Sequence, residues 1–170
     1  MLEMRTAGDP GRSLRQAVGC FPSGAVALAA TSGGVPSGFF LNSFTSVSLA
    51  PPLVSVCVQH TSRTWPELRP RRRLGLSVLA AGDIGSARQL SSRDGDRFRG
   101  IGWEATVEGS VFISSATAFL DCRVYEELEA GDHVLVLLEV LGCSADPTRP
   151  PLVFHASQFR ALAAHTTERV

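Results

Sequence analysis

Short polar side chains gather in one stretch of the 170-residue chain, between residues 42 and 64. The polar members of its first part are Asn42, Ser43, Thr45, Ser46 and Ser48. Amides and hydroxyls of this kind hydrogen-bond a flat polar heterocycle without burying an unpaired charge. Further along, Ser62, Arg63 and Thr64 combine two hydroxyls with a guanidinium, a set suited to a phosphate. The order of these groups therefore indicates a cradle for a ligand with a heterocyclic and a phosphorylated part.

Each of these groups also has an ordinary structural use. Asn and Ser are common in tight turns, where they hydrogen-bond their own backbone. Ser62, Arg63 and Thr64 precede a predicted helical turn over residues 64–68 and suit an N-cap, although a helix start also offers free backbone donors to a phosphate. Arg97 contributes a charge either to a phosphate or to a surface ion pair.

Charge and composition exclude several classes of function. The formal net charge is zero and 19% of the residues are charged, so we expect no broad electrostatic grip on nucleic acid or on a membrane surface. The apolar runs are too short to cross a bilayer and the first residues lack a secretory signal, which predicts a cytoplasmic protein. All 16 basic residues are Arg, so no lysine can form a Schiff base, and pyridoxal-phosphate and class I aldolase chemistry are excluded.

The four cysteines, Cys20, Cys57, Cys122 and Cys143, lie singly on different predicted elements. There is no Cys-x-x-Cys pair and no matching His spacing, so we expect buried thiols in a reducing compartment and no metal site. Cys57 has apolar neighbours that raise the pKa of a thiol, and it is therefore expected to pack rather than to act as a nucleophile.

The elements that must position these residues are mostly strands. Hydrophobic spacing predicts helices over residues 13–21 and 85–92. Strands are predicted over residues 25–31, from 35 onward, and over 53–58, 74–80, 118–126, 133–141 and 152–155. Turn residues near 32–34 and 130–131 predict two hairpins. This pattern favours a mainly β (β-rich α+β) domain with a few short helices, in which closure of the sheet into a barrel removes exposed edges.

The length allows one domain, which we place at residues 13–162. Residues 1–12 are expected to form a flexible N-terminal arm and residues 163–170 a C-terminal tail.

Several segments, in the order found here, resemble the short-chain flavin reductase family. Residues 38–57 read GFFLNSFTSVSLAPPLVSVC and Ser-Arg-Thr follows at 62–64. The other matching segments are DRF at 96–98 with Trp103, LDCRV at 120–124, GDH at 131–133 and PLVFH at 151–155. The resemblance implies an FMN-binding split β-barrel that is homodimeric, with the flavin near the subunit interface.

The resemblance also implies roles for individual residues. Flavin contacts are implied for the polar residues of 42–48 and for the backbone around Cys57 and Val58. A phosphate site is implied at Ser62, Arg63, Thr64 and Arg97. His133 is implied as the catalytic residue that helps to place the nicotinamide, with Asp132 orienting its ring and His155 near the dinucleotide. Without the resemblance, Asp132 is a turn former and His133 a partly exposed strand residue.

The implied activity is that of an NAD(P)H:flavin oxidoreductase, which passes a hydride from NADH or NADPH to FMN or FAD. The reduced flavin then diffuses to a separate flavin-dependent monooxygenase. No Gly-x-Gly-x-x-Gly motif opens a helix, and none is needed where the nicotinamide stacks on the flavin inside a barrel. Two other hypotheses stay open: a flavoprotein that retains its flavin and acts directly on a small substrate, and a non-catalytic flavin-binding protein.

Two positions depart from the family pattern. Phe40-Leu41 stands where Thr-Ala is usual, and Phe40 stacks on the flavin or narrows the nicotinamide entrance if it faces the cavity, but changes little if it faces the core. Ala156-Ser157-Gln158 follows His155 where the family commonly has an Arg-Gly pair, so the resemblance does not carry over a dinucleotide contact by that arginine.

Overall fold

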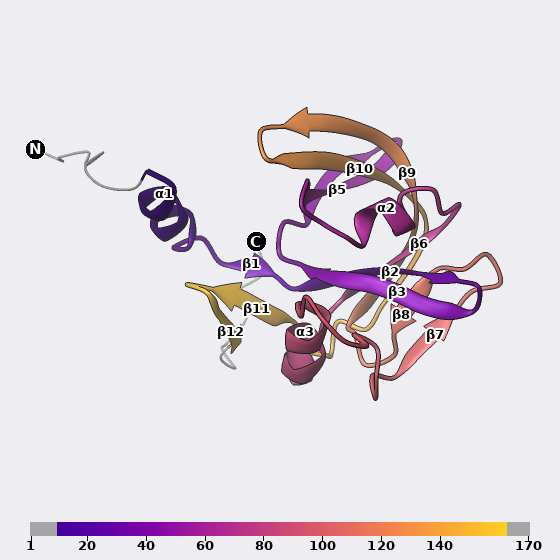
Figure 1. Cartoon of the computed structure of the whole chain (residues 1–170). Helices are drawn as coiled ribbons and strands as arrows, with labels where there is room; N and C mark the ends of the chain where they lie inside the picture. The colour runs from indigo at the N-terminus through magenta and orange to yellow at the C-terminus, as the bar shows by residue number, and fades with distance from the viewer. Residues whose placement is uncertain (1–9, 163–170) are drawn as a thin grey trace, which may run out of the picture.

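The computed structural model describes residues 10–162, which form a strongly curled antiparallel sheet with short helices packed on it (Figure 1). The main sheet has seven strands in the order β3-β2-β6-β9-β10-β5-β4. These strands are β2 Val26–Ser32, β3 Val35–Leu41, β4 Thr45–Leu49, β5 Pro52–Gln59, β6 Leu74–Val78, β9 Ala118–Ala130 and β10 His133–Ala145.

Two small sheets and four helical segments complete the described chain. One sheet pairs β7 Trp103–Ala105 with β8 Val111–Ile113, and the other has the order β1-β11-β12. The strands of the latter are β1 Ser23–Gly24, β11 Leu152–His155 and β12 Gln158–Ala161. The helical segments are α1 Pro10–Val18, α2 Trp65–Leu68, the 3₁₀ turn η1 Ala81–Asp83 and α3 Ile84–Leu90.

The curl of the main sheet follows from its connectivity. β3 and β4 are its two edges, yet β3 ends at Leu41 and β4 begins at Thr45. A fully extended chain covers at most about 14 Å over that distance. A flat sheet of this order would hold its edge strands roughly 29 Å apart, at the usual spacing between strands. The sheet must therefore curl until its edges approach one another, which is the geometry of a barrel.

Alternate side chains of β2 enter two separate cores. Val26 and Leu28 lie inside the curl and belong to the same buried cluster as Trp65 of α2. Ala27 and Ala29 point to the other face, where they share a second cluster with Leu90 of α3. Since β2 is buried on both faces, α2 and α3 are held on opposite sides of it, and the loops beside these helices are fixed relative to the sheet.

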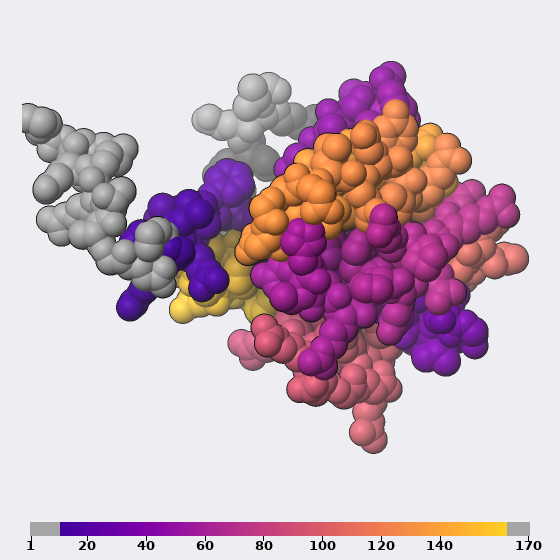
Figure 2. All heavy atoms as spheres, turned by 45° about the horizontal axis from the view of Figure 1, so that its top comes forward, coloured from indigo at the N-terminus to yellow at the C-terminus, as the bar shows by residue number. Residues whose placement is uncertain are grey.

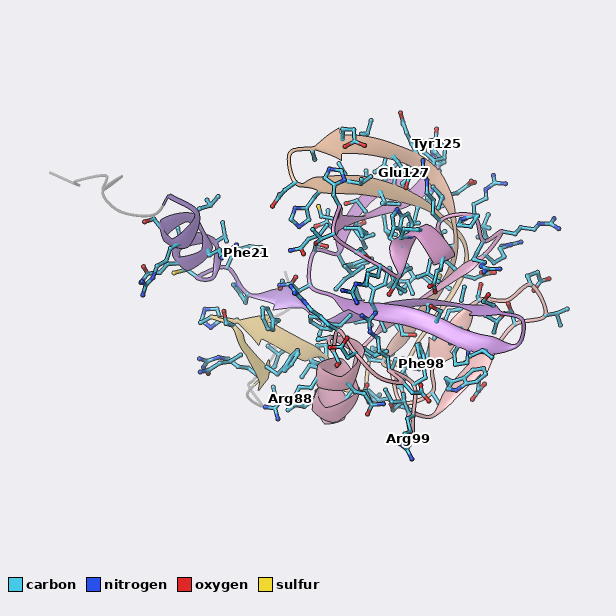
Figure 3. The ribbon with its side chains drawn as sticks, in the orientation of Figure 1. Phe21, Arg88, Phe98, Arg99, Tyr125 and Glu127 are labelled. Carbon is cyan, nitrogen blue, oxygen red and sulfur yellow. The ribbon has the colours of Figure 1, made fainter. Side chains whose placement is uncertain are left out.

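The β9–β10 hairpin closes over α2, and Figure 2 shows the orange hairpin directly beside the magenta segment that contains this helix. The indole Nε1 of Trp65 donates a hydrogen bond of 2.9 Å to Oε1 of Glu127, and Arg69 pairs with the same carboxylate at 2.6 Å. Glu127 is labelled in Figure 3, on the strand β9. These contacts tie α2 to the hairpin.

The mainly β architecture predicted from the sequence is confirmed, as are the two predicted hairpins. One strand was not among those predicted: Thr45 to Leu49 form the edge strand β4. β4 pairs only with β5, and its apolar side chains, Val47 and Leu49, are exposed. The segment is five residues long and mostly Ser and Thr, which suit a loop as well as an edge strand.

The predicted domain limits, residues 13 and 162, stay a prediction. Residues 1–9 and 163–170, which fall in the expected arm and tail, lie outside the described residues. The predicted start at residue 13 falls inside α1, which begins at Pro10 and stands beside the barrel (Figure 1). Phe21, labelled in Figure 3, is exposed just after this helix.

The expectation of four buried thiols was also wrong. Cys122 is buried, and burial together with the charge of Asp121 raises the pKa of its thiol to about 12. Cys57 is partly buried, whereas Cys20 and Cys143 are exposed. Cys20 follows the end of α1 and Cys143 lies in the outer part of β10, and neither place is covered by a second layer.

The turn of the β11–β12 hairpin gives a prediction about stability. Ala156 and Ser157 form this two-residue turn with φ angles of 50° and 60°. A left-handed backbone costs a residue other than glycine roughly 1–2 kcal/mol. We expect Ala156→Gly to raise the free energy of unfolding by about 1 kcal/mol and the melting temperature by about 2–4 °C, measured by calorimetry.

Ala161→Gly is the matched control, because Ala161 lies in the adjacent strand β12 without a positive φ. It should lower stability by about 0.5–1 kcal/mol, the usual cost of glycine within a strand. A fall in melting temperature for Ala156→Gly as well would show that the turn is not strained.

Candidate functional site

A cavity of about 550 Å³ lies where β3 and β5 end and β10 begins. Its remaining walls come from the loop that precedes α2 and from the end of α3 with the loop that follows it. The volume lies within the range of small-molecule sites. The predicted site residues that line the cavity are Asn42, Ser43, Cys57, Val58, Ser62, Arg63, Thr64, Arg97 and His133.

Ser43 fixes the closure of the sheet at the edge of this cavity. Its hydroxyl donates to the carbonyl oxygen of Cys57 at 3.1 Å and accepts from the amide of Cys57 at 2.9 Å. The single hydroxyl proton is therefore in use, and only one lone pair is left for a ligand. The amide of Asn42 makes no side-chain hydrogen bond within residues 10–162 and is available to a bound molecule.

Arg97 joins three segments at the cationic end of the cavity. One of its Nη atoms donates to the hydroxyl of Thr64 at 2.7 Å and to the carbonyl oxygen of Gly38 at 3.2 Å. The Ser62 hydroxyl accepts from the amide of Trp65 at 3.2 Å, the first residue of α2. This helix has four residues, too few for a useful macrodipole, so positive charge here comes from the guanidinium groups.

His133 reaches the cavity from the start of β10 and is held by its neighbour. Its Nδ1 lies 2.7 Å from Oδ1 of Asp132, whose side chain is exposed outside the cavity. The hydrogen bond from His133, with the charges of His133 and His60, holds the pKa of Asp132 below its ordinary value. The contact fixes the ring so that Nε2 is the atom left for a ligand.

His60, to which the sequence assigned no role, anchors the turn that carries His133. Its backbone amide donates to the carbonyl oxygen of Asp132 at 3.1 Å. Its Nε2 lies 3.2 Å from the carbonyl oxygen of Gly131 and 3.3 Å from Glu129. The loop of residues 60–64 and the tip of the β9–β10 hairpin therefore form one connected unit.

Four other predicted site residues lie outside the cavity lining. Thr45 and Ser46 are exposed on β4, where they pair with Ser55 and Val54 of β5. The hydroxyl of Ser48 accepts from the amide of Ala50 at 3.3 Å. His155 pairs with Gln158 in the C-terminal hairpin. Contacts of these four residues with a flavin or a dinucleotide stay a prediction.

The sequence left open whether Phe40 faces the cavity or the core, and in the structure it contacts both. It lines the cavity, and its ring also packs edge-on against Phe154 at 6.0 Å and Phe159 at 5.4 Å between centroids. The C-terminal hairpin thus supports an aromatic wall of the cavity.

The sequence analysis missed Gln59, Thr61 and Arg93, which also line the cavity. Arg93 belongs to a polar stretch that reads as a turn, and nothing in that stretch distinguishes it from an arginine that faces water. The lining contains three arginines and no Asp or Glu, so the cavity favours an anionic ligand.

Neither a metal centre nor a spanning segment was found in the part of the chain that the structure describes. Residues 10–162 hold no group of three or more His, Cys, Asp or Glu side chains that could bind a metal ion. Within the same residues, no helix combines the length and the apolar character needed to cross a membrane.

Comparison with known proteins gives consistent results. Residues 18–163 match the family described as the flavin reductase like domain. A flavin reductase of Pseudomonas putida is 32% identical over 162 residues, covering 95% of each chain. The reductase subunit HsaB of a flavin-dependent monooxygenase from Rhodococcus jostii is 32% identical, covering 94% of this chain and 81% of its own.

A solved structure shares the fold. The NADH:FAD oxidoreductase of Streptomyces globisporus, in complex with NAD and FAD fragments, superposes with a TM-score of 0.86 at 34% identity. The match covers 94% of this chain and 98% of that one. The split-barrel architecture expected from the sequence is thereby confirmed.

The His133–Asp132 contact gives a prediction about pH. In His133→Gln, the charge and the ring hydrogen bond that lower the pKa of Asp132 are both lost, so this pKa should rise toward the ordinary aspartate range. Because the pKa is lowered in the folded protein, the contact stabilises above the unfolded pKa, and this contribution disappears as pH falls through the lowered value. The measurement is an NMR titration of the side-chain carboxyl carbons.

Asp146 is the internal control, since its pKa is lowered mainly by hydrogen bonds from Thr148 and should be the same in both proteins. An unchanged pKa of Asp132 in the variant would rule out His133 as the cause.

Proposed function

The chain belongs to the flavin reductase-like family, and from this premise we infer that it is an NAD(P)H:flavin oxidoreductase. It reduces FMN or FAD and supplies the reduced flavin to a separate monooxygenase. The observation that carries the assignment is the cavity itself, in which the predicted heterocycle, phosphate and nicotinamide residues come together from distant parts of the sequence.

The residues of the cavity fit a flavin. Phe40 offers apolar surface to a planar ring, and the free amide of Asn42 can meet its polar edge. Arg63 and Arg97, with the hydroxyls of Ser62 and Thr64, suit a phosphate. No carboxylate in the lining opposes that phosphate.

The protein contributes position rather than covalent chemistry. When bound, the two cofactors supply a hydride transfer from nicotinamide to flavin. Asn42 and the backbone near Cys57 orient the flavin, while the arginines hold its phosphate at the other end. His133, oriented by Asp132, faces the cavity and places the nicotinamide against the flavin. Phe40 sets the width of the entrance.

Reduced flavin must leave such an enzyme, and the groups that line the cavity are of a kind that allows the flavin to dissociate. The available groups are hydrogen-bonding side chains and guanidiniums at the protein surface, whose interactions with a ligand are reversible. A monooxygenase partner is supported by the relative from Rhodococcus jostii, which is the reductase subunit of a flavin-dependent monooxygenase.

We further propose that the chain forms a homodimer in the cytoplasm, where NAD(P)H is used. The outer face of the β9–β10 hairpin exposes apolar side chains, with Tyr125 at 53% and Leu128 at 42% of their full exposure. Tyr125 is labelled in Figure 3, at the outer face of the hairpin. Burial of this face against a second copy would remove it from water.

The activity is tested with purified protein, FMN or FAD, and NADH or NADPH, by the loss of nicotinamide absorbance. We expect oxidation that saturates with free flavin, and flavin that separates from the protein on gel filtration. Flavin that stays bound and turns over slowly would instead indicate a flavoprotein acting on its own substrate. Flavin binding without oxidation above the flavin-only control would indicate a carrier.

The role of His133 is tested with His133→Gln in stopped-flow measurements of flavin reduction. Because a misplaced nicotinamide lowers the rate of transfer, we expect a rate roughly 10- to 100-fold lower. The Kd for flavin, measured separately by calorimetry, should change less than about threefold, since the phosphate residues are intact. An equal loss of flavin affinity would show that His133 holds the flavin instead.

A further inference from the structure

Gln59 and His133 lie directly opposite each other where β5 ends and β10 begins. They are register partners in the antiparallel pair of these two strands. Directly opposed residues point to the same face of a sheet, with their Cβ atoms about 4.5–5.5 Å apart. Both residues line the cavity, so a bound molecule that touches one of these side chains is within reach of the other.

The carboxamide of Gln59 is oriented by one neighbour. Its Oε1 accepts a hydrogen bond of 3.3 Å from the hydroxyl of Thr61, which also lines the cavity. The Nε2 group carries two hydrogens and makes no hydrogen bond to any group of residues 10–162. Gln59 is exposed to solvent, which leaves these two donors open to a ligand that enters from outside.

His133 offers the complementary atom. Its Nδ1 lies 2.7 Å from Oδ1 of Asp132, and because a carboxylate only accepts hydrogen bonds, the hydrogen of the neutral ring is on Nδ1. Nε2 is then an acceptor. The backbone amide of His60 donates to the carbonyl oxygen of Asp132 at 3.1 Å, which holds the two strand ends in register. An amide donor from β5 and an imidazole acceptor from β10 therefore lie side by side.

A donor beside an acceptor matches a primary carboxamide. Such a group presents a carbonyl oxygen and an amino group on one carbon atom, so it can accept a hydrogen bond and donate another in the same direction. The nicotinamide ring carries one carboxamide, next to the ring carbon that releases the hydride. No Asp or Glu in the cavity lining competes for the donors of Gln59.

We propose that Gln59 recognises the nicotinamide carboxamide, by donating a hydrogen bond from Nε2 to its carbonyl oxygen. The amino group of the carboxamide donates to Nε2 of His133, so both strands hold the same group. These two contacts fix the rotation of the ring substituent and, with it, the position of the neighbouring carbon. The proposal rests on the proposed reductase function and identifies a residue that determines the specificity for its reductant.

The position of Gln59 along β5 separates this contact from the flavin. Cys57, whose backbone is assigned to the flavin, lies two residues before Gln59 on the same face of the strand. Two residues of a strand span about 7 Å. A flavin edge at Cys57 therefore leaves Gln59 to a second ring.

The test uses Gln59→Leu with NADH and with its thionicotinamide analogue, in which sulfur replaces the carbonyl oxygen and accepts hydrogen bonds weakly. We expect the KM for NADH in flavin reduction to rise roughly 3- to 10-fold, the usual effect of losing one hydrogen bond between neutral groups. The KM for the analogue should rise less than about twofold. NADPH carries the same carboxamide and replaces NADH if it is the better substrate.

A binding measurement without turnover accompanies the kinetics. The probe is a tetrahydro analogue of NADH, whose ring keeps the carboxamide but transfers no hydride. Calorimetry on protein saturated with flavin should show its Kd rising roughly 3- to 10-fold in Gln59→Leu. The Kd values for FMN and FAD should change less than about twofold. Thr61→Val removes the bond that orients Gln59 and should give a smaller rise for the same probe.

Gln16→Leu is the matched control, because it is the same exchange at an exposed glutamine of α1, a helix that contributes no residue to the cavity. It should leave every KM and Kd unchanged. Three results with Gln59→Leu would each overturn the proposal. An equal rise for NADH and its thionicotinamide analogue would show that Gln59 only shapes the loop, a higher Kd for flavin would assign it to the flavin, and no rise would remove the contact.

The tetrahydro analogue separates the failure of this proposal from the failure of the proposed function. A Kd that depends on Gln59, without any oxidation of NADH or NADPH, would support the contact and remove the reductase function. Rapid oxidation together with no effect of Gln59→Leu would remove the contact and leave the reductase function.

Discussion

Three residues between Leu41 and Thr45 impose the geometry on which the structure depends. They join the two edge strands of a seven-stranded sheet, so the sheet must curl until these strands lie close together. Both bonds of the Ser43 hydroxyl to Cys57 then hold this linker against β5, the neighbour of one edge strand. The cavity lies at this junction, and the short polar residues of the linker, which a turn alone would explain, become part of its wall.

Charge and orientation at the site come from segments that the barrel brings to the same end. Arg97 bonds to both β3 and the loop before α2, so these elements cannot move independently. His60 attaches the same loop to the turn that carries His133. The groups assigned to the flavin phosphate and to the nicotinamide are thus parts of one hydrogen-bonded unit, which keeps their separation constant without a covalent link.

The sequence was most informative about site residues whose side-chain type alone indicates ligand binding. Asn42, Arg63 and His133 could be selected from residue types and from resemblance, but their proximity depends on strand order, which periodicity does not contain. β4 was missed because it is a short edge strand, rich in Ser and Thr, whose residues are typical of a loop as well. Arg93 was missed because a basic residue in a polar stretch looks the same whether it faces water or a ligand.

The aromatic contacts of the C-terminal hairpin determine what a proteolytic cut in this hairpin would do to the cavity. Phe154 and Phe159 pack against each other and against Phe40, so β11 and β12 support the cavity wall from behind. A protease that cut at the β11–β12 turn and released β12 would take away one of the two supporting rings. Phe40 would then be free to swing, and ligand selectivity would change although every residue assigned to a ligand remained in the protein.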